Sequence, residues 1–548
     1  MIKYRYTVLR GHASQKGEKM DIREQITSGK ASIGIEFGST RIKAILVGDK
    51  PEPVASGAHD WQNSLENGVW TYSEEDIIKG LQSCFASLMA DVKEKYGVQL
   101  TTAASIGISA MMHGYLAFDE NDRLLVPFRT WRNTMTGEAA DILSESFAFN
   151  IPQRWSIAHL YQAILKKEGH IPQVRFITTL AGYVHFLLTG EKNIGIGDAS
   201  GMFPIDPETG SYNKNMLAKF AQLTENTAFS QQLIDILPAI VPVGECAGRL
   251  SENGAKLLDP TGVFGAGVPF CPAEGDAQTG MVATNSIAPR TGNVSAGTSI
   301  FAMVVLEREL SRLHRQIDIV TTPCGDPVAM VHCNNCTTEL NGWVELFDEL
   351  LRSCGCEMTK TELYNKLFAA ALDGDSDCSG IINYNYHSGE HVTGFTEGRP
   401  MLLRSPESKF NIPNVMRSLI YSCMSTLKIG MDILFDEEKV TLDNIYAHGG
   451  LFKSPVTGQR FLASALGVPV TLMTSAGEGG AWGIALLAAY QARENREEKL
   501  ADYLSKRVFA GAAGNTMAPH AEDAAGFAEY MKLYRAGLAA EQAAVEAQ

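Results

Sequence analysis

The stretch SIGIEFGSTRIKAILVGD, residues 32–49, decides the fold. Two runs of β-branched and aliphatic residues, 33–37 and 42–47, flank a Gly38-Ser39-Thr40-Arg41 turn, and this pattern predicts a β-hairpin. A carboxylate, Glu36, comes just before the turn. Glycine lets a ligand approach the backbone closely, and the neighbouring N–H and hydroxyl groups can donate to phosphate oxygens. The hairpin tip is therefore a candidate phosphate site with a charge beside it.

The same design recurs in the second half of the chain. In TGNVSAGTSIFAMVVLE, residues 291–307, a Gly297-Thr298-Ser299 turn again lies between two strand-like runs. Two hairpins that open the two halves indicate a duplicated domain. The glycine-rich segment 262–285 between them is a natural boundary. Strands alternate with amphipathic helices along the chain, so the expected class is α/β.

These patterns predict four segments, which are an N-terminal extension (residues 1–30), two α/β domains (31–284 and 285–510) and a C-terminal tail helix (511–548). The extension is polar and unpatterned, so we expect it to be mobile. It contains a second methionine, Met20, and the alternative is that the start codon was assigned too early. We expect residues 1–19 to contribute little to stability or turnover.

Length and composition exclude several classes of protein. A chain of 548 residues exceeds what one hydrophobic core usually supports, and an apolar content of 45% is enough to fill two or more cores. The net charge of −15 and the lack of a Lys/Arg block argue against nucleic acid as a partner. No apolar run approaches the roughly 20 residues that span a bilayer, and the N-terminal segment has no signal-peptide core. We therefore expect a cytoplasmic protein with no membrane partner.

The carboxylate beside the first hairpin tip has two interpretations. If the two turns face each other across an interdomain cleft, both bind phosphate, and Arg41 or Lys43 adds positive charge. A carboxylate next to a phosphate is repulsive unless a cation lies between them, so Glu36 then implies Mg²⁺ held through water. In the alternative, Gly38 only closes the hairpin and Glu36 is solvated.

A third glycine cluster favours a nucleotide site. The stretch IYAHGGLFKSPVTGQRFLASALGVPVTLM, residues 445–473, predicts a short strand, a Gly449-Gly450 turn, a helix and a second strand. In an α/β fold such a strand-to-helix turn is where nucleotides bind, because small residues admit a flat ring against the backbone. Three more glycines then open an apolar helix, at Gly479, Gly480 and Gly483.

Ten cysteines scattered through a chain of this length suit reduced thiols in a cytosolic protein. The motifs CNNC and CGC form a cluster that could be a zinc site, with the ligands Cys333, Cys336, Cys354 and Cys356. The second pair has a single residue between its cysteines, whereas structural zinc sites usually have two to four. The favoured interpretation is that most cysteines are small core residues. A redox dithiol is disfavoured as well, since nothing nearby resembles a thioredoxin-like unit.

On these motifs the chain resembles the FGGY carbohydrate kinases, which have the duplicated, ribonuclease H-like ATPase fold of actin and hexokinase. The resemblance covers about residues 31–536. Residues 36–43 resemble the family's first phosphate motif, 297–299 its second, and 449–454 its adenosine motif. GISAMMHGYLAFD, LLTGE and DASGMFPID are similar to xylulokinase segments. The decisive match is GDAQTG, residues 275–280.

The resemblance implies an ATP-dependent sugar kinase whose site lies in a cleft between two domains. The N-terminal domain would bind sugar and phosphate and supply Asp276 as the catalytic base. Asp276 and Glu36 would hold Mg²⁺, and the sugar contacts carried over are Met112, His113, Asp276 and Gln278. The C-terminal domain would bind most of the nucleotide. The ATP contacts implied are Gly38, Ser39, Thr40, Lys43, Gly297, Thr298, Ser299, Gly449, Gly450, Leu451, Lys453 and Ser454.

Trp131, Arg132 and Asn133 offer an apolar face with hydrogen-bond donors, which is the usual make-up of a sugar subsite. A core tryptophan with solvated neighbours is the competing interpretation. His113 alone would more often be a core or loop histidine. With Gly114 beside it and a strand end before it, His113 becomes a credible contact for a polyol.

The residues around Asp276 support the same role. Asp276 follows an apolar, strand-like run and precedes a predicted helix, so amides at the helix end should keep it ionised. It would orient a sugar hydroxyl and accept its proton, while Mg²⁺ and the two turns stabilise charge on the transferring phosphoryl group. The alternative is that Asp276 only caps the helix.

Several positions depart from the family pattern. Glu36 and Asn133 stand where aspartates are usual, and Met111 replaces a glutamine. Ala277 stands where xylulokinases have a sugar-binding asparagine, and Leu451 replaces a third glycine as ribulokinases permit. These changes are compatible with kinase chemistry, but they leave the identity of the sugar undetermined.

A pentulose such as xylulose is the first expectation for the sugar. Ribulose comes next, because the length and the tail AEYMKLYRAGL resemble ribulokinases, and other ketoses or polyols follow. The phosphorylated hydroxyl and the oligomeric state stay open, a homodimer being one expectation.

Two functions from other classes compete with a kinase. A chaperone-like ATPase on the same fold would need a peptide-binding domain, and the chain after residue 510 is too short and too alanine-rich for one. A non-catalytic sugar sensor is disfavoured because no helix-turn-helix segment precedes the hairpin and Asp276 is intact. Sugar-dependent release of ADP distinguishes a kinase from both.

Overall fold

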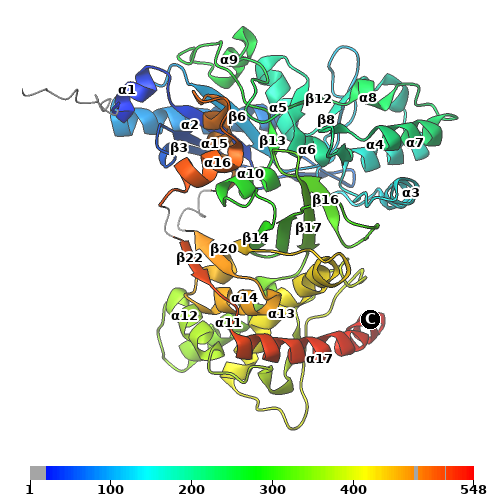
Figure 1. Ribbon diagram of the computed structural model, residues 1–548, viewed down its shortest axis with the longest axis vertical. Coiled ribbons are helices and arrows are strands. Elements are labelled where there is room, and N and C mark those ends of the chain that lie inside the picture. The colour runs from blue at the N-terminus through cyan, green and yellow to red at the C-terminus, as the bar shows by residue number, and fades with distance from the viewer. Residues whose placement is uncertain (1–19, 474–478, 512–513, 548) are drawn as a thin grey trace, which may run out of the picture.

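The computed structural model of the protein describes residues 20–473, 479–511 and 514–547. They form two α/β halves, one above the other along the longest axis in Figure 1. Each half is built around a mixed central sheet.

The sheet of the first half has the strand order β13-β6-β1-β2-β3. The first three strands in the chain form an antiparallel meander, and the other two run parallel to β1. Its strands are β1 (Ser32–Phe37), β2 (Arg41–Val47), β3 (Pro53–Asp60), β6 (Ser105–Ala110) and β13 (Glu274–Gly275). The predicted hairpin around Gly38 is therefore the β1–β2 pair, in which Glu36 lies opposite Lys43.

The sheet of the second half repeats this topology with one extra strand at each edge. Its order is β16-β17-β15-β14-β20-β21-β22, so the five strands from β17 to β21 correspond to β3, β2, β1, β6 and β13. Antiparallel and parallel pairs fall at the same places in both sheets. The predicted duplication is confirmed. The strands are β14 (Thr291–Ala296), β15 (Ile300–Val305), β16 (Asp318–Thr321), β17 (Pro327–Cys333), β20 (Asn444–Gly449), β21 (Val470–Met473) and β22 (Gly514–Met517).

Both halves also contain short two-stranded sheets outside the central sheet. They pair β4 (Ser64–Glu66) with β5 (Val69–Thr71), β7 (Leu116–Phe118) with β8 (Phe176–Thr178), β9 (Asn193–Gly195) with β12 (Ala239–Val241), β10 (Ile205–Asp206) with β11 (Ser211–Tyr212), and β18 (Ile382–Tyr384) with β19 (Met401–Leu403).

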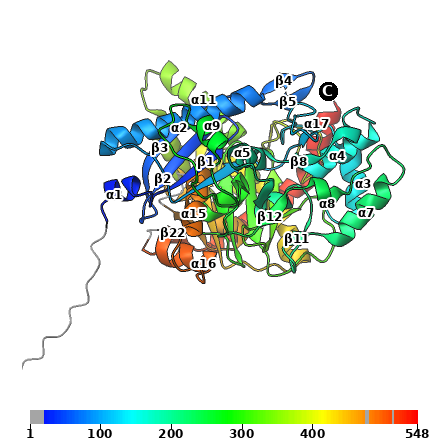
Figure 2. The same cartoon turned by 90° about the horizontal axis from the view of Figure 1, so that it is seen from above.

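Helices cover the sheets, and several of them form a lateral layer on the first half. In both views α3, α4, α7 and α8 gather on the side away from α1 (Figures 1 and 2). The helices up to residue 283 are α1 (Ile22–Thr27), α2 (Glu74–Tyr96), α3 (Gly137–Phe147), α4 (Ser156–Leu165), α5 (Leu180–Thr189), α6 (Ile196–Ser200), α7 (Lys214–Thr224), α8 (Leu233–Ile236), α9 (Glu252–Leu258) and α10 (Asp276–Ala283). The later helices are α11 (Thr337–Ser353), α12 (Lys360–Ala371), α13 (Ile412–Asp432), α14 (Thr457–Leu466), α15 (Gly479–Gln491), α16 (Leu500–Tyr503) and α17 (Ala521–Glu546).

Helix α2 shows how local sequence sets an element. The Ser73 side chain accepts a hydrogen bond from the Asp76 N–H (3.0 Å), and Gly97 ends the helix in the left-handed conformation. Residues at helical spacing are buried against β2 and β3, and these are Ile77, Leu81, Phe85, Leu88 and Val92. Burying each of them fully contributes about 1.5–3 kcal/mol.

Helix α15 crosses from the second half to the first. It is the next described element after β21, yet it packs on β1, β6 and α10 (Figure 1). The approach depends on glycine: a Cβ on Gly34 would lie 2.4 Å from Ala481 O, and one on Gly483 would lie 2.0 Å from Thr279 O. Helices α10 and α15 follow the equivalent strands β13 and β21, so they pack as a symmetry-related pair at the boundary of the halves.

Two of the expected segments need correction. The interpretation of residues 1–30 as a mobile extension is wrong for its described part, because α1 packs on the first half with Ile26 buried and Gln25 bonded to Asp49. Residues 1–19 lie outside the described residues. The tail after residue 511 is not only a helix, since β22 pairs with β21 before α17 packs back on the second half. The division at residue 285 stays a prediction.

One described helix, α13 with its continuation to Glu437, is long and apolar enough to cross a bilayer by length and composition. Within its most apolar stretch, 72% is buried inside the protein. Its side chains form the centre of the second core, with Met416, Ile420 and Met424 fully enclosed. This helix is therefore a core element of the second half.

The packing of α15 on α10 generates a prediction. Gly483→Ala should destabilise the protein by about 1–3 kcal/mol, because the new methyl group meets the Thr279 carbonyl and the helices must separate. Gly280→Ala on the facing helix is the matched control. Nothing lies within 4 Å of its added Cβ, so helix propensity alone should act, and it favours alanine by about 1 kcal/mol. Urea unfolding of both variants measures the difference, and equal free energies of unfolding would contradict the packing.

Candidate active site

The parallel strands of each sheet carry the predicted motifs at one edge. In the first sheet, the carboxyl ends of β1, β6 and β13 lead directly to Gly38, Met111 and Asp276. In the second, β14 and β20 lead to the turns at Gly297 and Gly449. The carboxyl edge of such sheets is where ligands bind. In the second sheet β21 lies beside β20, and the next described element, α15, packs on β1 and β6 of the first sheet.

Asp276 is the first residue of α10 and keeps part of its surface accessible. Its Oδ1 accepts a hydrogen bond from the Met112 N–H (3.1 Å), which ties the ends of β13 and β6 together. Burial raises the pKa of Asp276, whereas backbone N–H groups of Met112 and Ala277 lower it. The expected amide donors are present, but burial outweighs them in setting the direction of the pKa shift.

Glu36 lies between β1 and the start of α15. Its Oε2 accepts a hydrogen bond from the Ala481 N–H (3.0 Å), and a Cβ on Gly480 would come within 2.2 Å of its Oε1. Burial and, to a smaller extent, the negative charge of Asp276 raise the pKa of Glu36 to about 7, against the opposing effects of the Ala481 amide and Lys43. The carboxylates of Glu36 and Asp276 are therefore close enough to interact electrostatically. Gly480 lets α15 pack directly against the Glu36 side chain.

The buried carboxylates extend beyond the predicted pair. Asp198, on α6, accepts a hydrogen bond from Thr179 Oγ1 (2.5 Å), and its Oδ1 is buried with no partner among the described residues. Burial and, to a smaller extent, the charge of Asp276 raise the pKa of Asp198 to about 7, against the opposing bond from Thr179. Glu274 accepts a hydrogen bond from the Asp198 N–H (2.9 Å), and burial raises its pKa to about 8. Sequence reasoning missed both residues, although the charge that ends an apolar run in CPAEGD was a signal.

Both hairpin tips have their backbone carbonyls occupied. At the first tip, Trp61 Nε1 donates to Gly38 O (2.7 Å), Trp61 N to Thr40 O (3.1 Å) and Tyr72 Oη to Ser39 O (2.7 Å). Trp61 and Tyr72 stack with ring centroids 4.1 Å apart, which holds these donors in place.

At the second tip, Cys336 N donates to Thr298 O (3.0 Å), and Thr337 Oγ1 donates to Gly297 O (2.8 Å). The N–H groups of Gly38 and Gly297 close their own hairpins by donating to Arg41 O (3.0 Å) and Ser299 O (2.9 Å). Carbonyl oxygens repel phosphate oxygens, so occupying them leaves the other N–H groups and the hydroxyl groups of the tips as the groups that suit an anion.

The adenosine motif requires a glycine at its first position. Gly449 has φ of 111°, and a Cβ there would lie 2.2 Å from Ala296 O, beside the second hairpin. Gly450 and Lys453 are exposed at this turn, as a ligand site needs. Leu451 and Ser454 are buried, and Leu451 belongs to the second hydrophobic core, so both side chains support the turn from beneath.

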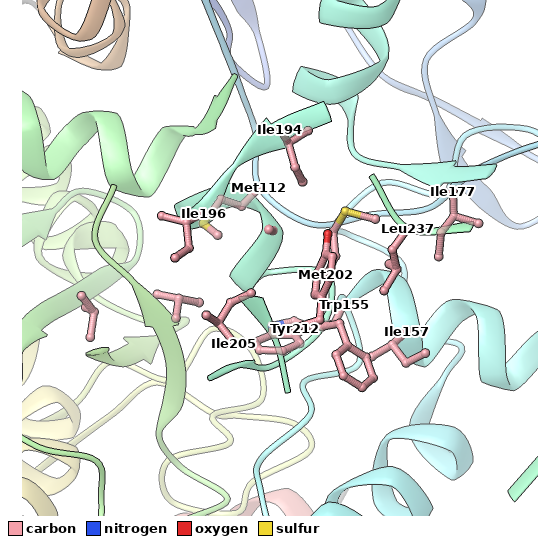
Figure 3. Close-up of a cluster of buried hydrophobic side chains, with 14 of the residues drawn as sticks. Met112, Trp155, Ile157, Ile177, Ile194, Ile196, Met202, Ile205, Tyr212 and Leu237 are labelled. Carbon is pink, nitrogen blue, oxygen red and sulfur yellow. The ribbon is translucent and has the colours of Figure 1, made fainter. Parts of the chain in front are cut away.

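Met112 and His113 lie at the end of β6 beside Asp276. Figure 3 shows Met112 within a cluster of buried apolar side chains that also includes Ile196 and Trp155. The His113 ring stacks on Trp155 with centroids 6.1 Å apart, and its Nδ1 lies 3.1 Å from Gly201 O. Burial lowers the pKa of His113 to about 3, with help from the charge of Arg154. A neutral ring whose Nδ1–H donates to a carbonyl has Nε2 as an acceptor for a hydroxyl.

The other predicted sugar residues have mixed placements. Asn133 is buried, its Oδ1 accepts from Trp70 N (2.9 Å), and its Nδ2 donates to Trp70 O (2.9 Å) and Thr130 O (3.0 Å). These bonds use both amide hydrogens, so its observed role is to fix the loop. Arg132 lies over the Trp70 ring, 4.0 Å from its centroid, and Trp131 is 39% exposed, which excludes the core interpretation.

Gln278 bridges the halves. It is fully buried on α10, and its Nε2 donates to Thr321 O on β16 (3.1 Å). Its Oε1 is buried with no partner among the described residues. Thr321 N also donates to Ser200 Oγ (3.0 Å), so β16 is bonded to the first half at two points.

The four clustered cysteines cannot share one metal ion. Cys333 and Cys336 are buried before α11, whereas Cys354 and Cys356 are exposed after it. A helix of 17 residues is about 25 Å long, so the pairs lie at its opposite ends. All ten cysteines of the chain are free thiols. Burial raises the pKa of the Cys333 and Cys336 thiols, which makes them inert core residues.

Comparisons with known proteins agree with this architecture. Residues 31–283 match the family described as "FGGY family of carbohydrate kinases, N-terminal domain", and residues 292–492 match its C-terminal domain. The xylulose kinase of Haemophilus influenzae is 23% identical over 493 residues, covering 82% of this chain and 91% of the relative. The xylulose kinase of Escherichia coli is 24% identical over 492 residues, covering 86% and 92%.

Solved structures share the fold at low identity. The ligand-bound xylulose kinase from Lactobacillus acidophilus has a TM-score of 0.75 and 17% identity, covering 93% of this chain and 99% of that chain. The gluconate kinase from the same organism has a TM-score of 0.75 and 16% identity, with the same coverage. The fold is therefore shared by kinases with different named substrates.

The buried carboxylate Asp198 generates a prediction about pH. Its pKa of about 7 in the folded state lies above the model-peptide value of 3.8, so the folded state holds its proton more tightly than the unfolded state. That stabilisation is complete below about pH 4 and is lost as the pH rises to about 7. Asp198→Asn should flatten this part of the curve of Tm against pH, whereas Asn at the exposed Asp235 should not. An unchanged curve for Asp198→Asn would contradict the assignment.

Proposed function

The chain belongs to the FGGY family of carbohydrate kinases, and on that premise we propose that it transfers the γ-phosphoryl group of ATP to a hydroxyl of a pentulose such as xylulose. One observation carries the proposal. Asp276 is held at the carboxyl edge of the first sheet by the Met112 N–H, next to His113 and within electrostatic reach of Glu36. A base, a polyol contact and a charge that suits a metal ion thus occur together.

The reaction follows from these placements. The sugar hydroxyl binds with its hydrogen toward Asp276, and His113 Nε2 accepts a bond from a second hydroxyl. The hydroxyl oxygen attacks the γ-phosphorus, the bond from that phosphorus to the β-phosphate oxygen breaks, and the proton passes to Asp276. ADP and a sugar phosphate leave. The tips at Gly38–Thr40 and Gly297–Ser299 bind the phosphates, and the turn at Gly449–Gly450 binds the adenosine.

Glu36 and Asp276 fit Mg²⁺. The two carboxylates repel each other, and a cation between them would relieve that repulsion. Carboxylate oxygens are ligands that Mg²⁺ prefers. We propose that both carboxylates hold it, partly through water, with Lys43 opposite Glu36 across the hairpin. The bound ion would neutralise charge on the transferring phosphoryl group.

The choice of a pentulose rests on the two curated relatives, which are xylulose kinases. Ribulose and other ketoses or polyols are the alternatives, because the fold alone is shared with a gluconate kinase. The site includes Gln278, and the exposed Trp131 with Arg132 as an outer wall. We further propose a cytoplasmic location, which ten free thiols support, and homodimeric assembly stays a prediction.

The first experiment is a panel of ketoses, polyols and sugar acids in an assay of ADP release with ATP and Mg²⁺. A pentulose should give the highest kcat/KM. ADP release that does not depend on any sugar would favour a chaperone-like ATPase, and binding of sugar without ADP release would favour a sensor.

The role of Asp276 generates a prediction about turnover. Asp276→Asn keeps the size and the bond to the Met112 N–H but removes the proton acceptor, so kcat should fall by about 10² to 10⁴. Nucleotide Kd and Tm should stay close to those of the wild type. Measuring kcat, nucleotide Kd and Tm on one preparation distinguishes a catalytic base from a helix cap. A kcat within a few-fold of the wild-type value would mean that Asp276 only caps the helix.

A further inference from the structure

The second hairpin tip is held by a turn that the kinase reaction does not explain. Gly297 O accepts bonds from Thr337 N (3.2 Å) and Thr337 Oγ1 (2.8 Å), and Thr298 O accepts one from Cys336 N (3.0 Å). These donors belong to the segment CNNCT, which connects β17 to α11. The position of the tip therefore depends on the position of this segment.

A buried carboxylate fixes the segment from the other side. Glu390 is 0% exposed, and its Oε2 accepts bonds from Asn334 N (2.8 Å), Asn335 N (3.3 Å) and Asn335 Nδ2 (3.3 Å). Asn335 Oδ1 in turn accepts from the backbone N–H groups of His387 (2.9 Å) and Ser388 (3.1 Å). The segment and the loop that carries Glu390 are thus bonded in both directions.

Burying the charged form of Glu390 is energetically unfavourable. Burial raises its pKa to about 7, and the bonds from Asn335 and Asn334 oppose that shift. The Glu390 carboxylate accepts three hydrogen bonds from one turn, because the N–H groups of Asn334 and Asn335 point toward it. Without an acceptor these groups would be unsatisfied, and the turn would have to move.

The first hairpin shows the same arrangement built from unrelated residues. Its carbonyls accept bonds from Trp61 and Tyr72, two aromatic side chains in the segment that follows β3. The second tip uses the segment that follows β17, the strand equivalent to β3. Two different solutions at equivalent places indicate that occupying these carbonyls matters for what the tips bind.

We propose that Glu390 is a positioning residue for the phosphates of ATP: it holds the Asn334–Thr337 turn, which occupies the carbonyls of Gly297 and Thr298 and so leaves the N–H and hydroxyl groups of Thr298 and Ser299 to the nucleotide. The inference rests on the proposed function. It gives the CNNC motif a role as a bracing turn in place of a metal or redox site.

The test measures Kd for ATP, ADP and adenosine with four variants. Glu390→Ala removes the acceptor, and Glu390→Gln keeps an acceptor oxygen. Glu397→Ala in the same loop is the matched control, since its side chain is 66% exposed. Thr337→Val removes one bond to Gly297 O without changing size, and it decides the matter if Glu390→Ala fails to fold.

Glu390→Ala should weaken ATP binding by about tenfold or more and raise the KM for ATP, while adenosine binding and the KM for sugar stay within about twofold. Glu390→Gln should restore most of the loss, and Thr337→Val should weaken ATP by a smaller factor. Equal affinity of Glu390→Ala and wild type for ATP would overturn the inference, and so would an equal loss for ATP and adenosine. Wild-type protein that binds no ATP would instead overturn the proposed function.

Discussion

The contact between the start of α15 and β1 is the constraint on which the rest of the structure depends. The Ala481 N–H donates to Glu36 at 3.0 Å, and the helix approaches β1 so closely that Gly34 and Gly480 admit no Cβ. Because α15 is the next described element after β21 of the second sheet, this contact lies where the chain returns to the first half. The hairpin tips, the Gly449–Gly450 turn and Asp276 lie at the carboxyl ends of strands in the two sheets.

Burying carboxylates at this junction has an electrostatic consequence. Glu36, Asp276, Asp198 and Glu274 all have raised pKa values, with burial as the main cause and neighbouring negative charge as a further cause for the first, third and fourth. A buried, ionised carboxylate destabilises the protein unless a cation lies beside it. The chain therefore places charge that suits a metal ion beside backbone N–H groups that suit phosphate, and a phosphoryl-transfer site needs both.

Local patterns made much of the fold predictable from the sequence. The β1–β2 and β14–β15 hairpins follow from short apolar runs around glycine, and α2 follows from its serine cap and apolar spacing. Asp276 was proposed as the base from the resemblance of GDAQTG to the family motif, and its predicted place between a strand and a helix agrees with the structure. The crossing of α15 was not predictable, since its apolar face fits either sheet. Glu390 was missed for a related reason: the residues that bond its side chain lie 55 or more residues away along the chain. The bonds between Asn133 and Trp70 were likewise not evident from the sequence, and the place of Asn133 in a sugar site stays a prediction.

We propose that both sheets contribute to one site for phosphoryl transfer. Following the label from γ-radiolabelled ATP in the presence of xylulose and Mg²⁺ tests it most directly. The account predicts that the label appears in a sugar phosphate in an amount equal to the ADP formed. Label released as inorganic phosphate, with none in any sugar of the panel, would contradict it.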